Sequence, residues 1–156
     1  MQEDGIRRLV NHVATAGLAT VLGATMLAQA PSNQAMSAPP AVMKAFQQAY
    51  PGATISAVSP ERDNDRAIFR VESVDKGRRR VVLYDARGVA IEIAEQVDER
   101  DLPQPVAAAM RSHRRAIYVT GMKVTRDGSV LYQLTLRGTR KTAMVAKPDG
   151  TVVSFK

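Results

Sequence analysis

One pattern occurs twice in this chain, and the repeat constrains the fold more than any other feature of the sequence. The segment "PPAVMKAFQQAYPGATI" begins at Pro39, and the similar segment "PQPVAAAMRSHRRAIYV" begins at Pro103. Further along, "AIFRV" matches "VLYQL" and "YDARG" matches "AKPDG", in the same order and at a spacing of about 62 to 64 residues. A nearly constant spacing of this kind predicts two copies of one small supersecondary module.

Each copy opens with residues at helical spacing. In the first copy they occupy positions i, i+3, i+4 and i+7 and are Val42, Ala45, Phe46 and Ala49. The matching stripe of the second copy consists of Val106, Ala109, Met110 and His113. Such stripes are typical of helices that bury one side, and prolines lie just before each one, where a missing N–H is harmless. We therefore expect one short amphipathic helix at the start of each copy.

After each helix the apolar residues alternate with other residues, which predicts antiparallel strands with one buried face. Phe69 and Val71 alternate with Arg70 and Glu72. In the next such stretch Val89, Ile91 and Ile93 alternate with Ala90, Glu92 and Ala94. The second copy shows the same alternation in Val130, Tyr132, Leu134 and Leu136.

Glycine-containing turns separate the predicted strands. The segments "DKG", "ARG", "RDG" and "PDG" place glycine where a hairpin needs a positive φ, at Gly77, Gly88, Gly128 and Gly150. "DND" at residues 63–65 is a further candidate for a hairpin tip. In "AFQQAYPGATI", Pro51 ends the first helix and Gly52 allows the sharp turn into the first strand. The chain thus predicts a helix and about four strands, twice over, which is an α+β fold rather than a nucleotide-binding α/β fold.

The first 38 residues differ from the rest. Arg7 and Arg8 precede an apolar, uncharged run over residues 13–30 that ends in "AQA". This is typical of a secretory signal peptide, with an N-terminal membrane anchor as the alternative. We expect a signal peptide at residues 1–30, a flexible spacer at 31–38, and the repeats at 39–101 and 102–156. Export by this route predicts a periplasmic or secreted protein.

The break after the first helix and the turn after the third strand form a known pattern. The PepSY-like family of secreted proteins has a helix ending in Tyr-Pro-Gly-Ala and a strand ending in Asp-x-x-Gly, and the first copy resembles it at Tyr50, Pro51, Gly52, Asp85 and Gly88. The second copy departs from the pattern, because "RSHRRAIYV" replaces the break and Lys147 stands in place of the aspartate. The family is similar in fold to tandem-repeat beta-lactamase inhibitor proteins. The resemblance implies an antiparallel sheet of about eight strands with two helices on one face, and it implies no catalytic residues.

The composition leaves little for catalysis or metal binding. The chain has no cysteine, which excludes disulfides, thiolate metal sites and cysteine nucleophiles. After residue 38 the single histidine is His113, so zinc, copper and haem lack ligands. No Gly-x-Ser-x-Gly elbow accompanies it. We expect His113 to be a partly buried or edge residue of the second helix, and we expect no catalytic residue, metal site or cofactor.

Two charged segments can each be interpreted either as a binding site or as a solvated part of the surface. "EQVDERD" at residues 95–101 could hold a hard cation loosely, but it lacks the ligand spacing of a calcium loop, and a solvated connector in which Asp101 caps the second helix is favoured. "KGRRR" at residues 76–80 could bind phosphates or carboxylates, although charges at strand ends usually protect sheet edges. Nucleic-acid binding is not expected, because aromatic stacking platforms are scarce among three Phe, four Tyr and no Trp.

The net charge of +7 is unevenly distributed. Residues 39–101 contain ten Lys and Arg against eleven Asp and Glu, whereas residues 102–156 contain ten against two. In the second copy "RSHRRA" supplies a candidate basic patch of Arg111, Arg114 and Arg115. The electric field of this excess positive charge would attract anionic surfaces in a salt-dependent way. The alternative is that the charge only keeps the protein soluble.

The face of the predicted sheet that the helices leave open is the candidate binding site. Side chains expected there are Arg70, Glu72, Gln133, Thr135 and Arg137, with Ile68 and Leu131 among them. A broad, mixed polar and apolar surface suits protein recognition, although an ordinary half-exposed sheet would look similar. The sequence thus predicts an exported, non-enzymatic module that recognises or inhibits another protein. The alternative is electrostatic docking of the basic second copy to anionic lipid, lipopolysaccharide or an acidic partner.

Overall fold

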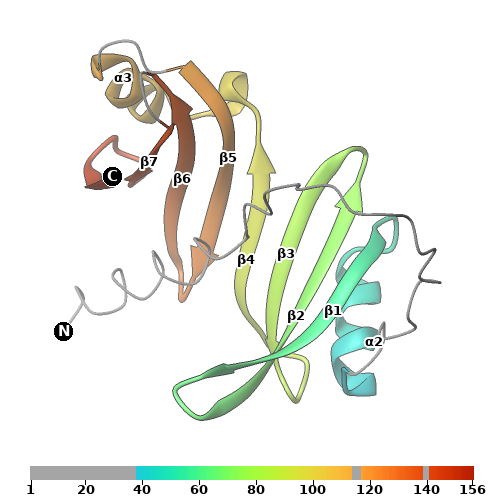
Figure 1. Cartoon of the computed structure of the whole chain (residues 1–156). Coiled ribbons are helices and arrows are strands. Elements are labelled where there is room, and N and C mark those ends of the chain that lie inside the picture. Colours follow the sequence, from blue (N-terminus) through green and yellow to red (C-terminus); the bar gives the residue numbers. More distant parts are fainter. Residues whose placement is uncertain (1–37, 114–116, 139–140) are drawn as a thin grey trace, which may run out of the picture. The chain divides into compact units, whose positions relative to one another are not determined.

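Two copies of one unit, a helix followed by four strands, make up the part of the chain that the structure describes (Figure 1). This computed structural model describes residues 38–113, 117–138 and 141–156. The first copy comprises α2 (Pro40–Ala49), β1 (Thr54–Asp63), β2 (Arg66–Asp75), β3 (Arg78–Asp85) and β4 (Ala90–Val97). After the short 3-10 helix η1 (Glu99–Asp101), the second copy comprises α3 (Gln104–Ser112), β5 (Ile117–Arg126), β6 (Ser129–Arg137), β7 (Lys141–Ala146) and β8 (Val152–Phe155).

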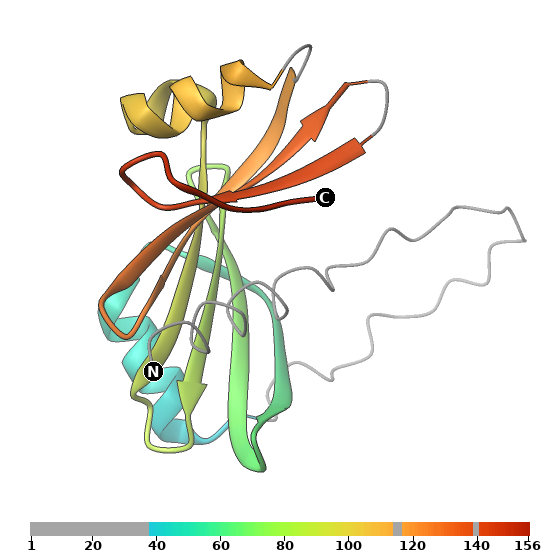
Figure 2. The same ribbon diagram turned by 90° about the vertical axis from the view of Figure 1, so that its left-hand side faces the viewer.

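All eight strands form a single antiparallel sheet in the order β1 to β8. The two copies join where β4 pairs with β5, from Glu92 opposite Arg126 to Val97 opposite Gly121. Figure 2 shows how the sheet twists along this order. The expected α+β fold with an antiparallel sheet of about eight strands is therefore confirmed.

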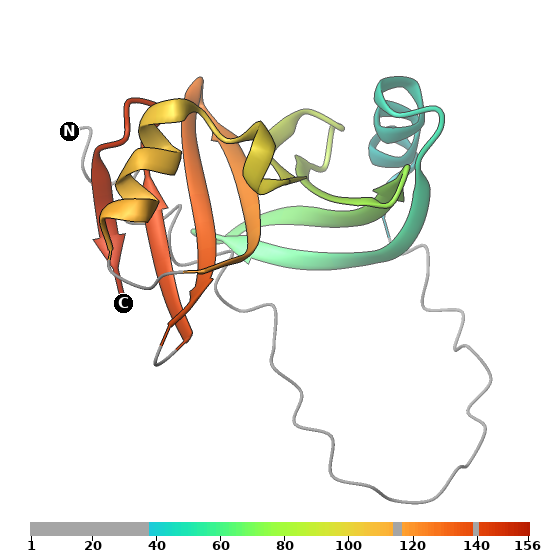
Figure 3. The same ribbon diagram turned by 90° about the horizontal axis from the view of Figure 1, so that it is seen from above.

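Both helices cover the same face of the sheet, as Figure 3 shows. Directly paired residues lie on one face, and one such row runs from Val58 in β1 through Val71 and Val82 to Ile93, Thr125 and Val130. At its β1 end this row packs with α2, and at its β6 end Val130 packs with the cluster around α3. The opposite face, which neither helix covers, is called the open face below.

Each helix buries its predicted stripe in a core of its own. Phe46 and Val42 of α2 pack with a buried group comprising Val58, Val71, Val82 and Tyr84. Met110 and Val106 of α3 pack with the second group, in which the buried strand residues are Tyr132, Leu134, Leu136, Met144 and Ala146. The stripes are narrower than predicted, since Ala49 at the end of α2 is exposed.

The repeat extends to irregularities of the backbone. The register shifts between Ile55 and Ala57 in β1 and again between Tyr118 and Thr120 in β5. It also shifts next to Tyr84 in β3 and next to Ala146 in β7. Bulges bend a strand and increase its twist, so equivalent bulges give the two copies the same curvature.

A glycine turn packs against the start of the helix in each copy. Gly88, after β3, has φ +83°, and a Cβ there would lie 2.6 Å from the Ala41 carbonyl oxygen. Gly150, after β7, has φ +87°, and a Cβ there would lie 2.7 Å from the Pro105 carbonyl oxygen. These two glycines therefore serve both the turn and the helix contact, which explains why "DARG" and "KPDG" recur at the same point of each copy.

Three local predictions were wrong. Gly52 does not adopt a positive φ, and a Cβ there would meet only the Asp75 carboxylate at 4.0 Å, so the break after α2 does not depend on glycine. Asp101 does not cap α3, because Pro103 is the N-cap and has no side-chain hydrogen bond. In β4 the expected buried face is reversed in part. Val89 precedes β4 and is exposed, whereas Glu92 and Ala94 of β4 are buried on the open face.

The predicted signal peptide (residues 1–30) and most of the spacer (residues 31–38) lie outside the described residues. Within the described ranges, no helix has the length and apolar character that crossing a membrane requires.

Truncation of Phe46 tests the first core. Phe46 is 1% exposed, so Phe46→Ala should lower the free energy of unfolding by about 3–5 kcal/mol, as for other buried aromatic side chains. Urea unfolding monitored by circular dichroism measures the change, with the exposed Gln47→Ala in the same helix as control. A loss under about 1 kcal/mol for Phe46→Ala would mean that this side of α2 does not face the core.

The glycine turns provide a matched pair of variants. Gly77 and Gly88 have similar positive φ values, but a Cβ at Gly77 meets nothing within 4 Å. Both alanine variants carry the backbone strain, whereas Gly88→Ala also collides with the Ala41 carbonyl and should be destabilised by about 1–3 kcal/mol more. Urea unfolding of the two variants gives the difference directly. Equal losses would show that the close approach to α2 contributes nothing.

Candidate functional site

The open face carries all five residues of the predicted binding surface. Arg70 and Glu72 lie on β2, and they alternate with Val71 and Ser73, which face the helices. Gln133, Thr135 and Arg137 lie on β6 and alternate with the buried α3 contacts Leu134 and Leu136. The period of two therefore placed these side chains on the predicted face.

The five residues do not form one cluster. Three strands separate β2 from β6, and at about 4.8 Å per strand the two groups lie roughly 19 Å apart along the sheet. Half-buried Gln96 of β4 and Met122 of β5 lie between them and form a row of directly paired residues with Gln133 of β6. This row was not identified from the sequence, because it depends on the pairing of β4 with β5.

Apolar side chains form the floor of the open face. Ile68 and Leu131, which were expected among the surface residues, are each only 2% exposed. They belong to a set of buried residues on this face that also includes Val81, Leu83, Ala94, Val124 and Val145. The expectation of a surface position for Ile68 and Leu131 was wrong, and polar groups of the open face surround an apolar floor.

An ion pair shows that the open face is concave. Arg126 Nη2 lies 2.7 Å from Asp63 Oδ2, although Arg126 is in β5 and Asp63 is at the end of β1. On a flat sheet four strand spacings, about 19 Å, would separate them. The two side chains can meet only because the sheet curves toward its open face.

Arg126 also contacts a buried carboxylate. Its Nη1 lies 3.6 Å from Glu92 Oε2, and the side chains of Glu92 and Arg126 are 3% and 13% exposed. Burying a carboxylate is unfavourable unless a cation or hydrogen bonds compensate. One feature of the sequence could have indicated this group, a glutamate between Ile91 and Ile93 in a predicted strand, but nothing in the sequence indicates its partner.

The β2 end of the open face carries a network of charges. Arg70 bonds Glu72 through Nε at 2.8 Å and lies 3.7 Å from Glu61. Arg79 Nη2 donates to the other Glu72 oxygen at 2.9 Å. Burial alone would raise the pKa of Glu72, but the hydrogen bonds and charges of the two arginines lower it below its usual value. Glu72 therefore remains ionised, and the network is fixed by charge-assisted bonds.

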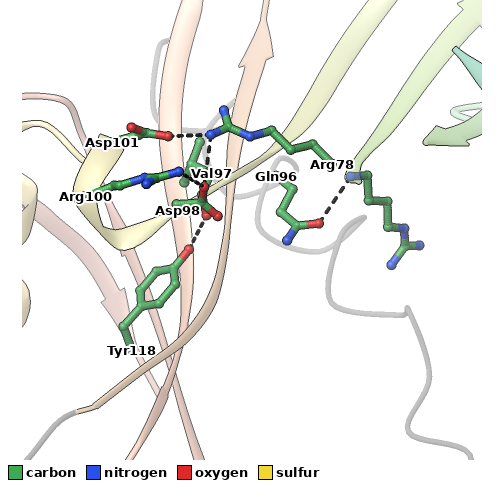
Figure 4. Close-up of polar contacts among 8 residues, drawn as sticks. Arg78, Gln96, Val97, Asp98, Arg100, Asp101 and Tyr118 are labelled. Carbon is green, nitrogen blue, oxygen red and sulfur yellow. Dashed lines mark hydrogen bonds and ion pairs between the residues drawn. The ribbon is translucent and has the colours of Figure 1, made fainter. Parts of the chain in front are cut away.

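Two arginines of the "KGRRR" run pair with carboxylates of the acidic segment at residues 95–101, as Figure 4 shows for Arg78. Arg78 Nη2 lies 2.9 Å from Asp98 Oδ2 and 2.8 Å from Asp101 Oδ2. Arg80 Nε donates to Glu95 at 3.0 Å, and its guanidinium lies 4.1 Å from the centre of the Tyr50 ring. All three arginines of the run are therefore paired with carboxylates of this chain, which argues against an anion site there. Among the described residues, no group of three or more potential ligands is placed to hold a metal ion.

Tyr118 ties β5 to the connector. Its hydroxyl donates to the Val97 carbonyl (Figure 4). Burial, followed by the negative charges of Asp98, Glu99 and Asp101, raises the pKa of Tyr118 to about 12. The phenol therefore stays protonated at all physiological pH values and acts as a donor that fixes the junction between the copies.

The basic patch of the second copy is only partly described. Arg111 is exposed in the last turn of α3, and Arg114 and Arg115 lie outside the described residues. His113 is the C-cap of α3, is half-buried, and stacks on Phe155 with ring centroids 4.0 Å apart. The prediction of a partly buried residue at the helix edge is confirmed for His113.

The fold can be compared with known proteins on this basis. No family model matches the chain, and no curated protein matches it. Solved structures do match. A BLIP-like protein from Bacteroides fragilis aligns with a TM-score of 0.60 at 18% identity, covering 80% of this chain and 89% of that one. The chain has a BLIP-like fold.

Two other bacterial structures share this BLIP-like fold. A DUF2874 family protein from Bacteroides ovatus has a TM-score of 0.62 at 16% identity over 78% of this chain and 88% of its own. A protein from Bacteroides eggerthii, provisionally described as periplasmic, aligns with a TM-score of 0.64 at 16% identity. The alignment covers 78% of this chain and 89% of that one. At these identities the likeness establishes the fold, and the PepSY-like resemblance stays a prediction.

Alkaline titration tests the environment of Tyr118. Its pKa is about 12 in the folded protein, against 10.0 for an unperturbed tyrosine, so it binds its proton more tightly when folded. Its contribution to stability is therefore complete below pH 10 and is lost as the pH rises from 10 to 12. Removing the phenol in Tyr118→Phe should make the decline of unfolding free energy over this interval shallower.

Urea unfolding at a series of pH values measures this slope. The Tyr118→Phe variant also loses a hydrogen bond, but that loss lowers stability equally below pH 10 and does not alter the slope. An unchanged slope would show that Tyr118 titrates normally in the folded protein.

Proposed function

We propose that this protein is an exported, non-enzymatic binding module that recognises or restrains another protein through its open face. The observation that carries the proposal is the concavity of this face, which follows from the contact between Asp63 and Arg126. A concave sheet spanning both copies offers one continuous surface to a convex partner.

The chemistry of the open face supports protein recognition. Interfaces combine an apolar centre with a polar rim, and they are enriched in methionine and arginine. Here the row of Gln96, Met122 and Gln133 crosses the middle of the face, and the charge network of Arg70 and Glu72 lies toward one side. Because that network is already paired, it favours a partner with a complementary arrangement of charges over a simple polyanion.

Two further observations support the absence of catalysis and the export of the chain. The described residues place His113 against Phe155 at the end of α3 rather than beside a nucleophile on the open face. The periplasmic description of the Bacteroides eggerthii structure agrees with the predicted signal peptide. A hydrolase or transferase activity that disappears with one side-chain substitution would contradict this part of the proposal.

Paired double variants test the open face. Met122→Arg with Thr135→Arg places two bulky cations on the open face, whereas Gln47→Arg with Gln48→Arg adds the same charge to the exposed side of α2. Immobilised protein is incubated with an envelope extract of its source cells, and the captured proteins are compared. We expect the open-face variant to capture at least about tenfold less of the partner than the wild-type protein, which corresponds to roughly 1.4 kcal/mol of binding free energy. The helix variant should capture as much as the wild-type protein.

Only variants whose midpoint of urea unfolding equals that of the wild-type protein are compared, so that reduced capture does not reflect unfolding. Equal capture by the two double variants would refute the open face as the binding site. Capture that persists at high salt agrees with the proposal.

A second candidate function is docking to an anionic envelope surface. In the described part of the second copy, every ion pair within 4.0 Å involves Arg126. Lys141 and Lys156 therefore make no such ion pair among the described residues, and the positive charge of Lys147 acts on nearby Asp149. Cosedimentation with vesicles of anionic lipid at low and high salt tests this function. Binding at low salt that is lost at high salt would favour it, and no binding at either salt concentration would exclude it.

A further inference from the structure

The strand β8 ends the sheet and pairs on one side only. In the order of the described strands it neighbours β7 alone, and Figure 3 places it at the end of the sheet beside α3. Pairing continues past the end of β8, because Ala143 N donates to the Lys156 carbonyl at 2.7 Å and Lys156 N donates to the Ala143 carbonyl at 2.9 Å. β8 is therefore firmly held on its inner side.

The outer side of β8 presents hydrogen-bonding groups of the main chain. In an antiparallel ladder, a residue that makes both bonds to its partner alternates with one whose N–H and C=O point to the other side. Lys156 makes both bonds to Ala143, so the N–H and C=O of Phe155 point outward. An incoming strand could bond to these groups.

The side chains of β8 also differ from those of a protected edge. Natural edge strands discourage pairing with proline and charged residues, and β1, at the other end of the sheet, contains Pro60, Glu61 and Asp63. β8 contains neither proline nor charge. Instead it exposes apolar side chains, since Val152 and Val153 are each 37% and Phe155 is 43% exposed. The His113 ring stacked on Phe155 widens this apolar surface.

The charge around β8 selects the partner. Arg111, Lys141, Lys147 and Lys156 are exposed residues of α3, β7 and the segments that flank β8. The one acidic residue of residues 141–156 is Asp149, whose carboxylate accepts a hydrogen bond from Thr151 N within its own turn. A second copy of this chain would bring its own basic edge against this one, which is repulsive. An acidic strand would be attracted.

We propose that β8 accepts an extended, acidic segment of a partner protein as a ninth strand. Main-chain bonds to Phe155 supply affinity, and alternate side chains of the partner contact the apolar surface of Phe155 and His113. The acidic side chains of the segment approach Lys141 and Lys156. Lys141 and Lys156 lie on the open-face side of this edge, because Lys141 pairs with Arg137 and Lys156 pairs with Ala143 opposite Thr135. The main-chain bonds of the site are at the edge of the sheet, and they do not depend on the function proposed for the open face.

A pair of capped synthetic peptides tests the proposal on the full chain. One alternates valine with glutamate, and the control alternates valine with lysine. Amide hydrogen exchange of Phe155, measured by NMR, is the readout, because its N–H is exposed on the free edge and bonded in the complex. We expect saturating glutamate peptide to slow exchange at Phe155 at least about tenfold, and we expect the lysine peptide to have no effect.

A charge reversal provides the second measurement. Lys141→Glu with Lys156→Glu changes exposed side chains only, so the fold should be retained, and the variant should bind the lysine peptide in preference to the glutamate peptide. Unchanged exchange at Phe155 with either peptide would refute the site. Equal protection by both peptides would refute the acidic partner. A dimer in sedimentation that slows exchange at Phe155 without peptide would identify a second copy as the occupant and contradict the proposal.

Discussion

The pairing of β4 with β5 joins the two copies into one sheet. A helix with four strands has two open edges and one small core, which is marginal for a unit of about 60 residues. Six residue pairs between Glu92 and Val97 on β4 and Arg126 and Gly121 on β5 remove one edge from each copy. They also make the open face continuous, and they leave β1 and β8 as the ends of the sheet.

Arginine residues have different roles in the two copies. In the first copy Arg78, Arg79 and Arg80 are each bound to a carboxylate of the same copy or of the connector that follows it. In the second copy Arg126 reaches back to Asp63 and Glu92 and so maintains the curvature of the open face. Because these pairs use the acids of the first copy, the second copy retains its positive charge, and the charge asymmetry of the sequence persists on the folded surface.

Much of the fold could be predicted because its signals are local. The stripe of Val42 and Phe46, and the glycines with positive φ such as Gly88 and Gly150, each report on a few neighbouring residues. The placement of Arg70 and Thr135 on the open face followed from the same period of two. Local signals failed where two of them competed. The run from Val89 to Ile93, at the start of β4, suggested one buried face, but Glu92 faces the concave side and is buried beside Arg126.

The order of helices and strands, the turns between them and the division of charge between the copies could all be inferred from sequence, since hydrophobic periodicity and turn chemistry act over a few residues. The burial of Ile68 and Leu131, the pairing of Arg78 and Arg80 with carboxylates of residues 95–101, and the apolar outer edge of β8 follow from tertiary structure. Each of these depends on which distant strands pair and how strongly the sheet curves. The contact between Asp63 and Arg126 joins residues 63 positions apart, and no local pattern records it.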